Sequence, residues 1–199
     1  MSDAVYTIGH STHSADAFVA LLTRHGVDAV ADVRSSPYSR YNPQFNREDL
    51  KATLSEAGIE YVYLGDELGA RAKDRTCYVG GRVDYERLAA TPLFQRGLER
   101  IAAEAEQRRV ALMCAEKDPL ACHRTILVAR HVVARGIAVR HILEDGRLED
   151  HDAAMTRLLA DLGWPEQDLF RTREQIIEDA YRHKGREIAH EEEVQSETT

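Results

Sequence analysis

Residues 110–136 read VALMCAEKDPLACHRTILVARHVVARG and carry the strongest structural signal in the chain. The first four residues are all apolar, which is typical of a central strand in a parallel sheet. Apolar residues dominate again after Cys122, and this second apolar segment stops at Gly136. We therefore predict a buried strand, a polar loop and a buried helix in succession.

The same alternation of strand and helix extends along the chain on both sides of this segment. Further strands are predicted at 5–8, 27–33, 59–64 and 137–142, and helices are predicted after Ser14, Asn46 and Thr91 and near 152–162 and 172–190. This order predicts an α/β fold with three layers: a mostly parallel central sheet of about five strands, and helices on both faces. Residues 65–83 show no clear period and are predicted to be a long loop, either functional or mobile, with solvated basic side chains.

The chain has 199 residues, which suits one α/β domain over residues 1–190 and a polar, disordered tail over 191–199. No run of 18 apolar residues occurs, so no membrane span is expected. The N-terminus lacks a basic stretch followed by an apolar core, so we expect a cytoplasmic location. Three cysteines fit that location better than they fit a disulfide framework.

The charge distribution limits the partners that the chain can bind. The formal net charge is −8, yet residues 32–124 contain fifteen Lys and Arg and fifteen Asp and Glu. An acidic protein without a basic block is a poor candidate for a general nucleic-acid coat. A local arginine cluster within the neutral segment could still hold one small anion.

Reactive side chains follow the predicted strands at their carboxyl ends, which is where sheets of this kind bind ligands. The candidates are His10 and Ser11 after the first strand, Asp32, Arg34 and Arg40 at and after the second, and Cys114, Glu116, Cys122, His123 and Arg124 after the fourth. The opposite edge of the sheet offers mostly glycine. A ligand site is therefore expected at the carboxyl edge.

The loop after the fourth strand is expected to place Cys122, His123 and Arg124 in the first turn of a helix. Free N–H groups and the helix dipole there favour an anion and lower the pKa of a thiol. Arg124 would supply a forked donor for phosphate or carboxylate. Plainer interpretations stay open, because Cys114 could be a small buried apolar residue and Asp32 could simply pair with Arg34.

Five motifs in register resemble those of the DUF488 family, a family of unknown function: TIGHST (7–12), DVRSSP (32–37), NPQFN (42–46), YLGDELG (63–69) and CAEKDP…CHR (114–124). The resemblance extends over a core of about 6–150, and helices over 151–190 resemble a C-terminal extension. It implies an α/β domain that is often described as an enzyme because of its paired cysteines, without a known reaction. The motif residues here are His10, Asp32, Arg34, Cys114, Glu116, Cys122, His123 and Arg124.

Three functions are consistent with these residues. The first is an enzyme acting on a phosphate- or nucleotide-containing anion, with Cys122 or Cys114 as nucleophile or redox thiol, His10 or His123 as acid or base, and Asp32 orienting one of these groups. In this hypothesis Arg34 and Arg124 bind the anion, assisted by Ser11, Glu116 and Arg40. The residues indicate no cofactor and leave the oligomeric state open.

The two alternatives use the same loops differently. A metal site could use Cys114, Cys122, His123 and His10, but we rank it lower and assign no metal ligand. The spacing lacks Cys-x-x-Cys, and adjacent Cys122 and His123 on one helix rarely face one ion. A non-enzymatic module for a nucleotide or nucleic acid could use the interleaved aromatic and basic side chains of Tyr38, Arg40, Tyr41 and Phe45.

Overall fold

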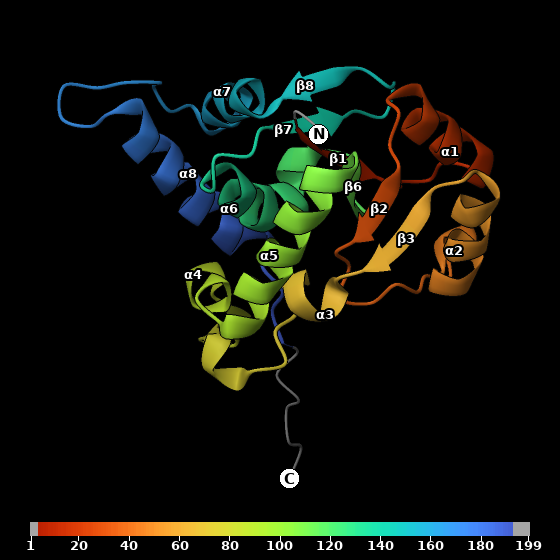
Figure 1. Ribbon diagram of the computed structural model, residues 1–199. Helices are drawn as coiled ribbons and strands as arrows, with labels where there is room; N and C mark the ends of the chain where they lie inside the picture. The colour runs from red at the N-terminus through yellow and green to blue at the C-terminus, as the bar shows by residue number, and fades with distance from the viewer. Residues whose placement is uncertain (1–3, 193–199) are drawn as a thin grey trace, which may run out of the picture.

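The structure, a computed structural model, describes residues 4–192, and its centre is a twisted sheet (Figure 1). Within these residues the sheet has six strands in the order β3-β2-β6-β1-β7-β8. Their bounds are β1 (Val5–Gly9), β2 (Ala29–Asp32), β3 (Glu60–Tyr63), β6 (Val110–Cys114), β7 (Val139–Ile142) and β8 (Leu148–Asp150). The first five are parallel, and β8 pairs antiparallel with β7. The predicted α/β fold with a mostly parallel sheet is confirmed, with β8 added at one edge.

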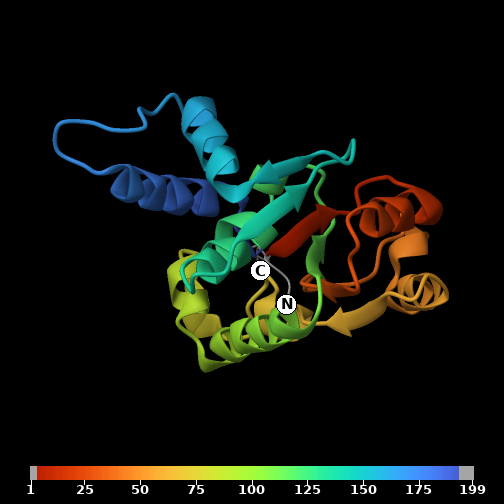
Figure 2. The same ribbon diagram turned by 45° about the horizontal axis from the view of Figure 1, so that its top comes forward.

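Helices cover both faces of the sheet, as Figures 1 and 2 show. On one face lie α1 (Ala15–Arg24) and α2 (Arg47–Glu56), and on the other lie α5 (Pro92–Gln107), η4 (Arg124–Ala129) and α6 (Arg130–Val133). Successive side chains of a strand point to opposite faces. In β6, Ala111 and Met113 accordingly join the core under α1 and α2, while Leu112 joins the core under α5. Burial on both faces explains why this strand is apolar throughout.

Residues 65–83 differ from the expected long loop. They contain a series of short elements, α3 (Gly65–Leu68), η2 (Arg75–Cys77), β4 (Tyr78–Val79) and β5 (Arg82–Val83), and α4 (Tyr85–Ala89) follows. Elements of two to five residues are too short to produce a periodic apolar pattern, so the sequence could not reveal them. Gly80 and Gly81 both have positive φ, at 59° and 81°, and they form the tight turn between β4 and β5.

Helices follow Ser14, Asn46 and Thr91 as predicted, and two of these three residues cap their helix with the side chain. The Ser14 hydroxyl accepts a hydrogen bond from the N–H of Ala17, and the Thr91 hydroxyl accepts one from the N–H of Phe94. Asn46 precedes α2 but makes no side-chain cap, because its Oδ1 accepts from the N–H of Ser39 at 2.8 Å. It fixes the loop between β2 and α2 instead.

The chain closes with α7 (His151–Leu162) and α8 (Arg173–Ile188). Glu191, placed at the start of the predicted tail, forms an antiparallel bridge and an ion pair with Arg82. The rest of that tail, 193–199, lies outside the described residues. No helix in the described part of the chain is long and apolar enough to cross a membrane.

A chain of buried hydrogen bonds ties the C-terminal helices to the sheet. Thr7 Oγ1 lies 2.8 Å from His141 Nδ1, His141 Nε2 lies 3.1 Å from His151 Nδ1, and His151 Nε2 lies 2.6 Å from the Tyr181 hydroxyl. These residues belong to β1, β7, α7 and α8. Burial lowers the pKa of His151 from 6.5 to about 4, and it holds the pKa of His141 well below 6.5. Both rings are therefore neutral in the folded chain near pH 7.

The stability of the protein is expected to fall as the pH decreases through this range. Both histidines have folded-state pKa values below their unfolded value of 6.5, so below pH 6.5 the unfolded chain binds protons that the folded chain does not. Each contributes a slope of about 1.4 kcal/mol per pH unit until the pH approaches the folded pKa. Urea unfolding measured between about pH 7 and about pH 5 checks this. His151→Gln should reduce the slope, and an unchanged slope would contradict the assignment.

Candidate active site at the carboxyl edge of the sheet

The loop after β6 brings Cys114, Cys122 and His123 together. Asp118 caps the short helix η3 (Pro119–Ala121) through a bond from the N–H of Leu120 to its carboxylate. Cys122 then has an extended backbone, with φ −136° and ψ 140°, and His123 turns into the helical region, with φ −60° and ψ −25°. The expectation that Cys122, His123 and Arg124 all lie in the first helical turn is therefore wrong for Cys122, whereas His123 and Arg124 have helical backbones at the start of the helix. The helix begins at Arg124 as a π-helix of six residues.

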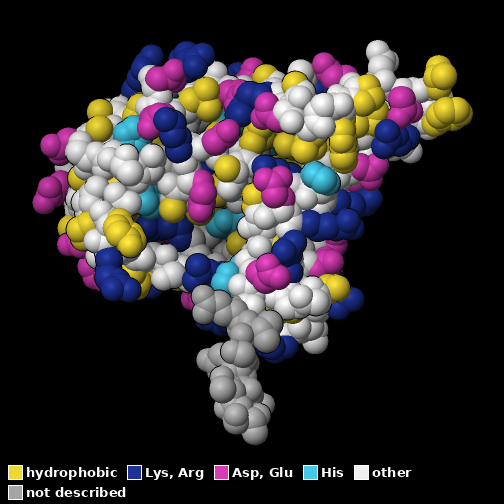
Figure 3. Space-filling model, turned by 180° about the vertical axis from the view of Figure 1, so that it is seen from behind, with side chains coloured by type: hydrophobic (Ala, Val, Ile, Leu, Met, Phe, Trp, Pro, Cys, Tyr) yellow, Lys and Arg dark blue, Asp and Glu magenta, His cyan; other side chains and the backbone are white. Residues whose placement is uncertain are grey.

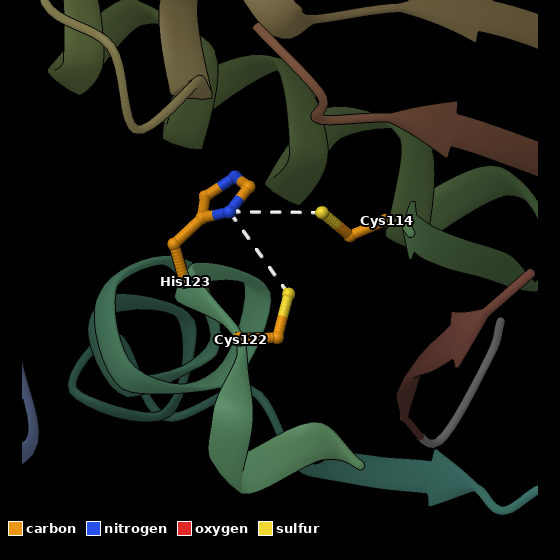
Figure 4. A group of neighbouring side chains, drawn as sticks. All are labelled: Cys114, Cys122 and His123. Carbon is orange, nitrogen blue, oxygen red and sulfur yellow. Dashed lines mark hydrogen bonds between the residues drawn. The ribbon is translucent and has the colours of Figure 1, made fainter. Parts of the chain in front are cut away.

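This backbone change lets two adjacent side chains face one point. On a regular helix Cys122 and His123 would diverge by about 100°. With Cys122 extended, both side chains turn toward Cys114, which enters from the end of β6 (Figure 4). His123 Nδ1 lies 3.6 Å from Cys114 Sγ and 3.9 Å from Cys122 Sγ. The geometric objection to a shared ion therefore does not hold for this loop.

The backbone of β2 determines which nitrogen of His123 faces the two sulfurs. His123 Nε2 lies 3.0 Å from the carbonyl oxygen of Val33, and a carbonyl can only accept, so Nε2 carries the proton. In the neutral ring Nδ1 then has a free lone pair, directed at the thiols. Burial opposes protonation of the ring, but the hydrogen bond to Cys122 and the charge of its thiolate raise the pKa of His123, so ionisation of Cys122 favours a proton on Nδ1. The imidazole is thus oriented either to accept a thiol proton or to bind a cation.

Cys122 has the most polar surroundings of the three cysteines. Its Sγ lies 2.9 Å from Glu116 Oε2 and accepts the N–H of Arg124 at 3.4 Å. Burial opposes ionisation, but the hydrogen bond from Cys114 and the charges of Arg124 and His123 lower the pKa of Cys122 well below its usual value. The hydrogen bond to Cys122, together with burial, raises the pKa of Cys114. The two thiols therefore differ in character: Cys122 ionises first, and Cys114 stays protonated beside it.

Arg124 has a different role from the one predicted. It is fully buried, and its guanidinium donates to the carbonyl oxygens of Glu116, at 2.6 Å, and Lys117, at 3.2 Å. A guanidinium with these bonds holds the loop between β6 and η3 and is not available as a forked donor to a ligand. Its positive charge still acts on the nearby Cys122 sulfur.

Asp32 and Arg34 form a buried ion pair next to this group. Arg34 donates from Nε to Asp32 Oδ1 at 2.9 Å and from NH2 to Asp32 Oδ2 at 2.6 Å. The hydroxyl of Tyr61 donates to the same carboxylate at 2.8 Å. Asp32 therefore orients Arg34 and does not reach a histidine.

His10 and Ser11 line a cavity of about 330 Å³. Arg34, Ser36 and Ala115 line both this cavity and the cleft over the thiols. His10 Nδ1 donates to the carbonyl of Ser11 at 2.9 Å, and Nε2 accepts from Arg34 NH1 at 3.3 Å. Burial lowers the pKa of His10 to about 4. Both ring nitrogens are bonded, and the ring stacks on Phe45 with centroids 4.4 Å apart. His10 is therefore a neutral side chain packed beside Arg34.

A cleft of about 290 Å³ opens over the thiols. It is lined by Arg34, Ser35, Ser36, Ala70, Arg71, Tyr85, Cys114, Ala115, Glu116, Ala121, Cys122, His123, Ile188 and His190. On the face seen in Figure 3, basic, acidic and histidine side chains border a hollow. The cleft thus brings together five of the predicted site residues: Arg34, Cys114, Glu116, Cys122 and His123. Arg40 is exposed and lines neither this cleft nor the cavity of His10.

The sequence did not single out Arg71, Tyr85 or His190 as site residues. Arg71 comes from the segment expected to be a loop, Tyr85 from the start of α4, and His190 from the chain after α8. Arg71 is exposed, its backbone N–H donates to Ser35 Oγ at 2.9 Å, and its side chain makes no ion pair with any residue of 4–192. The only available signal was the length of the aperiodic segment 65–83, because nothing local distinguishes Arg71 from its basic neighbours.

Comparison with known proteins identifies the family. The family described as Domain of unknown function DUF488 matches residues 14–131, which is more than half of the chain. The chain belongs to the DUF488 family. No curated protein and no solved structure gives a significant match.

The DUF488 match includes the Asp32–Arg34 pair, Arg71 and the whole loop from Cys114 to Arg124. It leaves out β1 with His10 and Ser11, and also α7 and α8. The resemblance expected over 6–150 is therefore shown over a shorter range. The residues that form the floor of the cleft are all within it.

Proposed function

We propose that this DUF488 chain is an enzyme that acts on a small phosphate- or nucleotide-containing anion bound in the cleft over Cys122. The observation that supports the proposal is the grouping of two thiols, an imidazole and a carboxylate on the cleft floor, below an arginine with no ion pair within residues 4–192. Clefts that combine groups of this kind are typical of catalytic sites.

Arg71 is the anion-binding residue in this proposal. Arg124 is committed to backbone carbonyls, and most of the charge of Arg34 is neutralised by Asp32. Arg71 lies on the cleft rim with its side chain exposed. An anion bound by Arg71, and by the face of Arg34 that lines the cleft, would hold the attached group over the Cys122 sulfur.

Arg71→Ala is expected to weaken binding of inorganic phosphate, pyrophosphate and adenosine monophosphate by about tenfold or more, the usual contribution of a charge-assisted hydrogen bond. Thermal shift titrations of the full chain measure this. The backbone bond of Arg71 to Ser35 survives the substitution, so the loop should keep its place. Arg96→Ala is the matched control. Arg96 is exposed and lines a neighbouring cavity of about 370 Å³ beside α3 and the start of α5, which Arg71 also borders, but it does not line the cleft. The proposal fails if no anion stabilises the wild type, or if both variants bind equally well.

A binding module for a nucleotide or a single strand is the second candidate. Tyr38 is 56% exposed and Tyr41 is 94% exposed, and both adjoin Arg40 beside the cavity of His10. Exposed aromatic rings next to basic side chains suit stacking of bases. In the same titrations, short oligonucleotides that bind more tightly than phosphate and lose affinity in Tyr41→Ala would favour this candidate.

A further inference from the structure

The thiols and the imidazole have the arrangement of metal ligands. Cys114 Sγ, Cys122 Sγ and a ring nitrogen of His123 all lie within 4.8 Å of one another. A tetrahedral zinc ion with its usual bond lengths holds sulfur and nitrogen ligands about 3.6 Å apart. The two distances from His123 Nδ1 to the sulfurs, 3.6 Å and 3.9 Å, are close to this value.

We infer that Cys114, Cys122 and His123 bind one zinc ion, with a fourth coordination position that opens into the cleft. The inference deepens the proposed function by naming the reactive group, and it rests on that function only for the placement of a substrate. Three protein ligands with one open position are the pattern of catalytic zinc, whereas structural zinc has four protein ligands. All three ligands line the cleft, so the open position faces the anion-binding rim.

The surroundings of the three ligands support a cation at this point. The Val33 carbonyl holds the proton of His123 on Nε2, as the outer partners of metal-bound histidines commonly do. Sulfur and imidazole together favour zinc over magnesium or calcium, which prefer oxygen. Two thiolates neutralise the charge of the ion, so the buried site gains no net charge.

Glu116 has a separate place beside the ion. Its carboxylate contacts Cys122 but does not belong to the group of three converging ligand atoms. It lines the cleft next to the open position. We assign it the role of hydrogen-bond acceptor for a water or substrate group bound there, which makes it a positioning residue and not a fourth ligand.

Metal analysis of the full chain tests the inference. The protein, purified without chelators and kept reduced, is expected to contain one zinc per chain. After removal of the zinc, Co²⁺ should produce thiolate-to-metal charge-transfer absorption. Cys114→Ser, Cys122→Ser and His123→Ala should each weaken zinc binding about 100-fold or more in competition with a chelator. Cys77→Ser is the matched control, because Cys77 is also buried but lines the neighbouring cavity, and its zinc affinity should be unchanged.

Two results would overturn the metal site. One is a reduced wild-type chain that holds no stoichiometric zinc and gives no thiolate band with Co²⁺, a readout that does not depend on whether the variants fold. The other is an equal loss of zinc in Cys77→Ser. Phosphate binding that depends on Arg71 but occurs without zinc would remove this inference and leave the proposed function intact. Stoichiometric zinc without anion binding would remove the proposed function and leave the metal site intact.

Discussion

Asp32→Ala is expected to lower the free energy of unfolding by about 3–5 kcal/mol, the usual cost of breaking a buried ion pair by removing one partner. Both side chains are buried, and the substitution leaves the guanidinium of Arg34 without its anion. The hydroxyl of Tyr61 loses its acceptor as well. Urea unfolding of the variant and the wild type at pH 7 measures the loss.

Two further variants test whether the loss of stability comes from burial of the charges or from the ion pair alone. Lys73→Ala removes an ion pair with Asp66 that is nearly as short, at 2.7 Å, but has side chains 83% and 56% exposed, so its loss should cost far less stability than Asp32→Ala. The double variant Asp32→Ala/Arg34→Met removes both buried charges and should be more stable than Asp32→Ala alone. A double variant that is less stable than Asp32→Ala would contradict this and would show that Arg34 stabilises the fold without Asp32, for example through its bond to the Phe45 carbonyl.

Gly9→Ala should cost about 3 kcal/mol, the upper part of the range for an overpacked interior. A Cβ at Gly9 would lie 1.9 Å from the carbonyl oxygen of Glu116, and a backbone atom cannot rotate away. That carbonyl accepts the bond from Arg124, so moving it also releases the loop that positions Cys122. We therefore expect the variant to lose zinc and phosphate binding together with stability.

Gly58→Ala is the control for this substitution. Its Cβ would meet nothing within 4 Å, and only its φ of 73° is unfavourable, so it should cost about 1 kcal/mol and keep both binding properties. Unfolding curves and zinc content of the two variants give the comparison. If Gly9→Ala were as mild as Gly58→Ala, the close approach of β1 to the loop would not matter for stability.

Long periodic elements were predictable from the chain, and short ones were not. The helix after Thr91 and the strand at Val110 have strong apolar patterns and appear close to the predicted bounds. The strand β8 has three residues, which are too few to show an alternating apolar pattern. A sheet edge of this size depends on pairing with β7, which no local pattern encodes.

Some features of the candidate site were also predictable from the sequence, and others were not. Its position at the carboxyl edge followed from the order of strands and helices, because parallel strands bring their carboxyl ends to one edge of the sheet. The convergence of Cys122 and His123 did not follow, because it depends on one extended residue before a π-helix. Arg71 could not be distinguished either, because the loop that carries it is placed by a bond to Ser35, 36 residues away.

The sequence by itself determined the α/β fold, the edge at which reactive side chains gather and the residue types present there. Only the tertiary structure decided which charged groups hold the scaffold and which face the cleft. Arg124 donates to carbonyls of its own loop, and His10 bonds the Ser11 carbonyl and Arg34 of the next βα loop, whereas the Arg71 side chain has no ion pair within residues 4–192. The physical reason is that most buried donors and acceptors are paired, and the folded packing decides which side chains are buried and which stay exposed at the cleft.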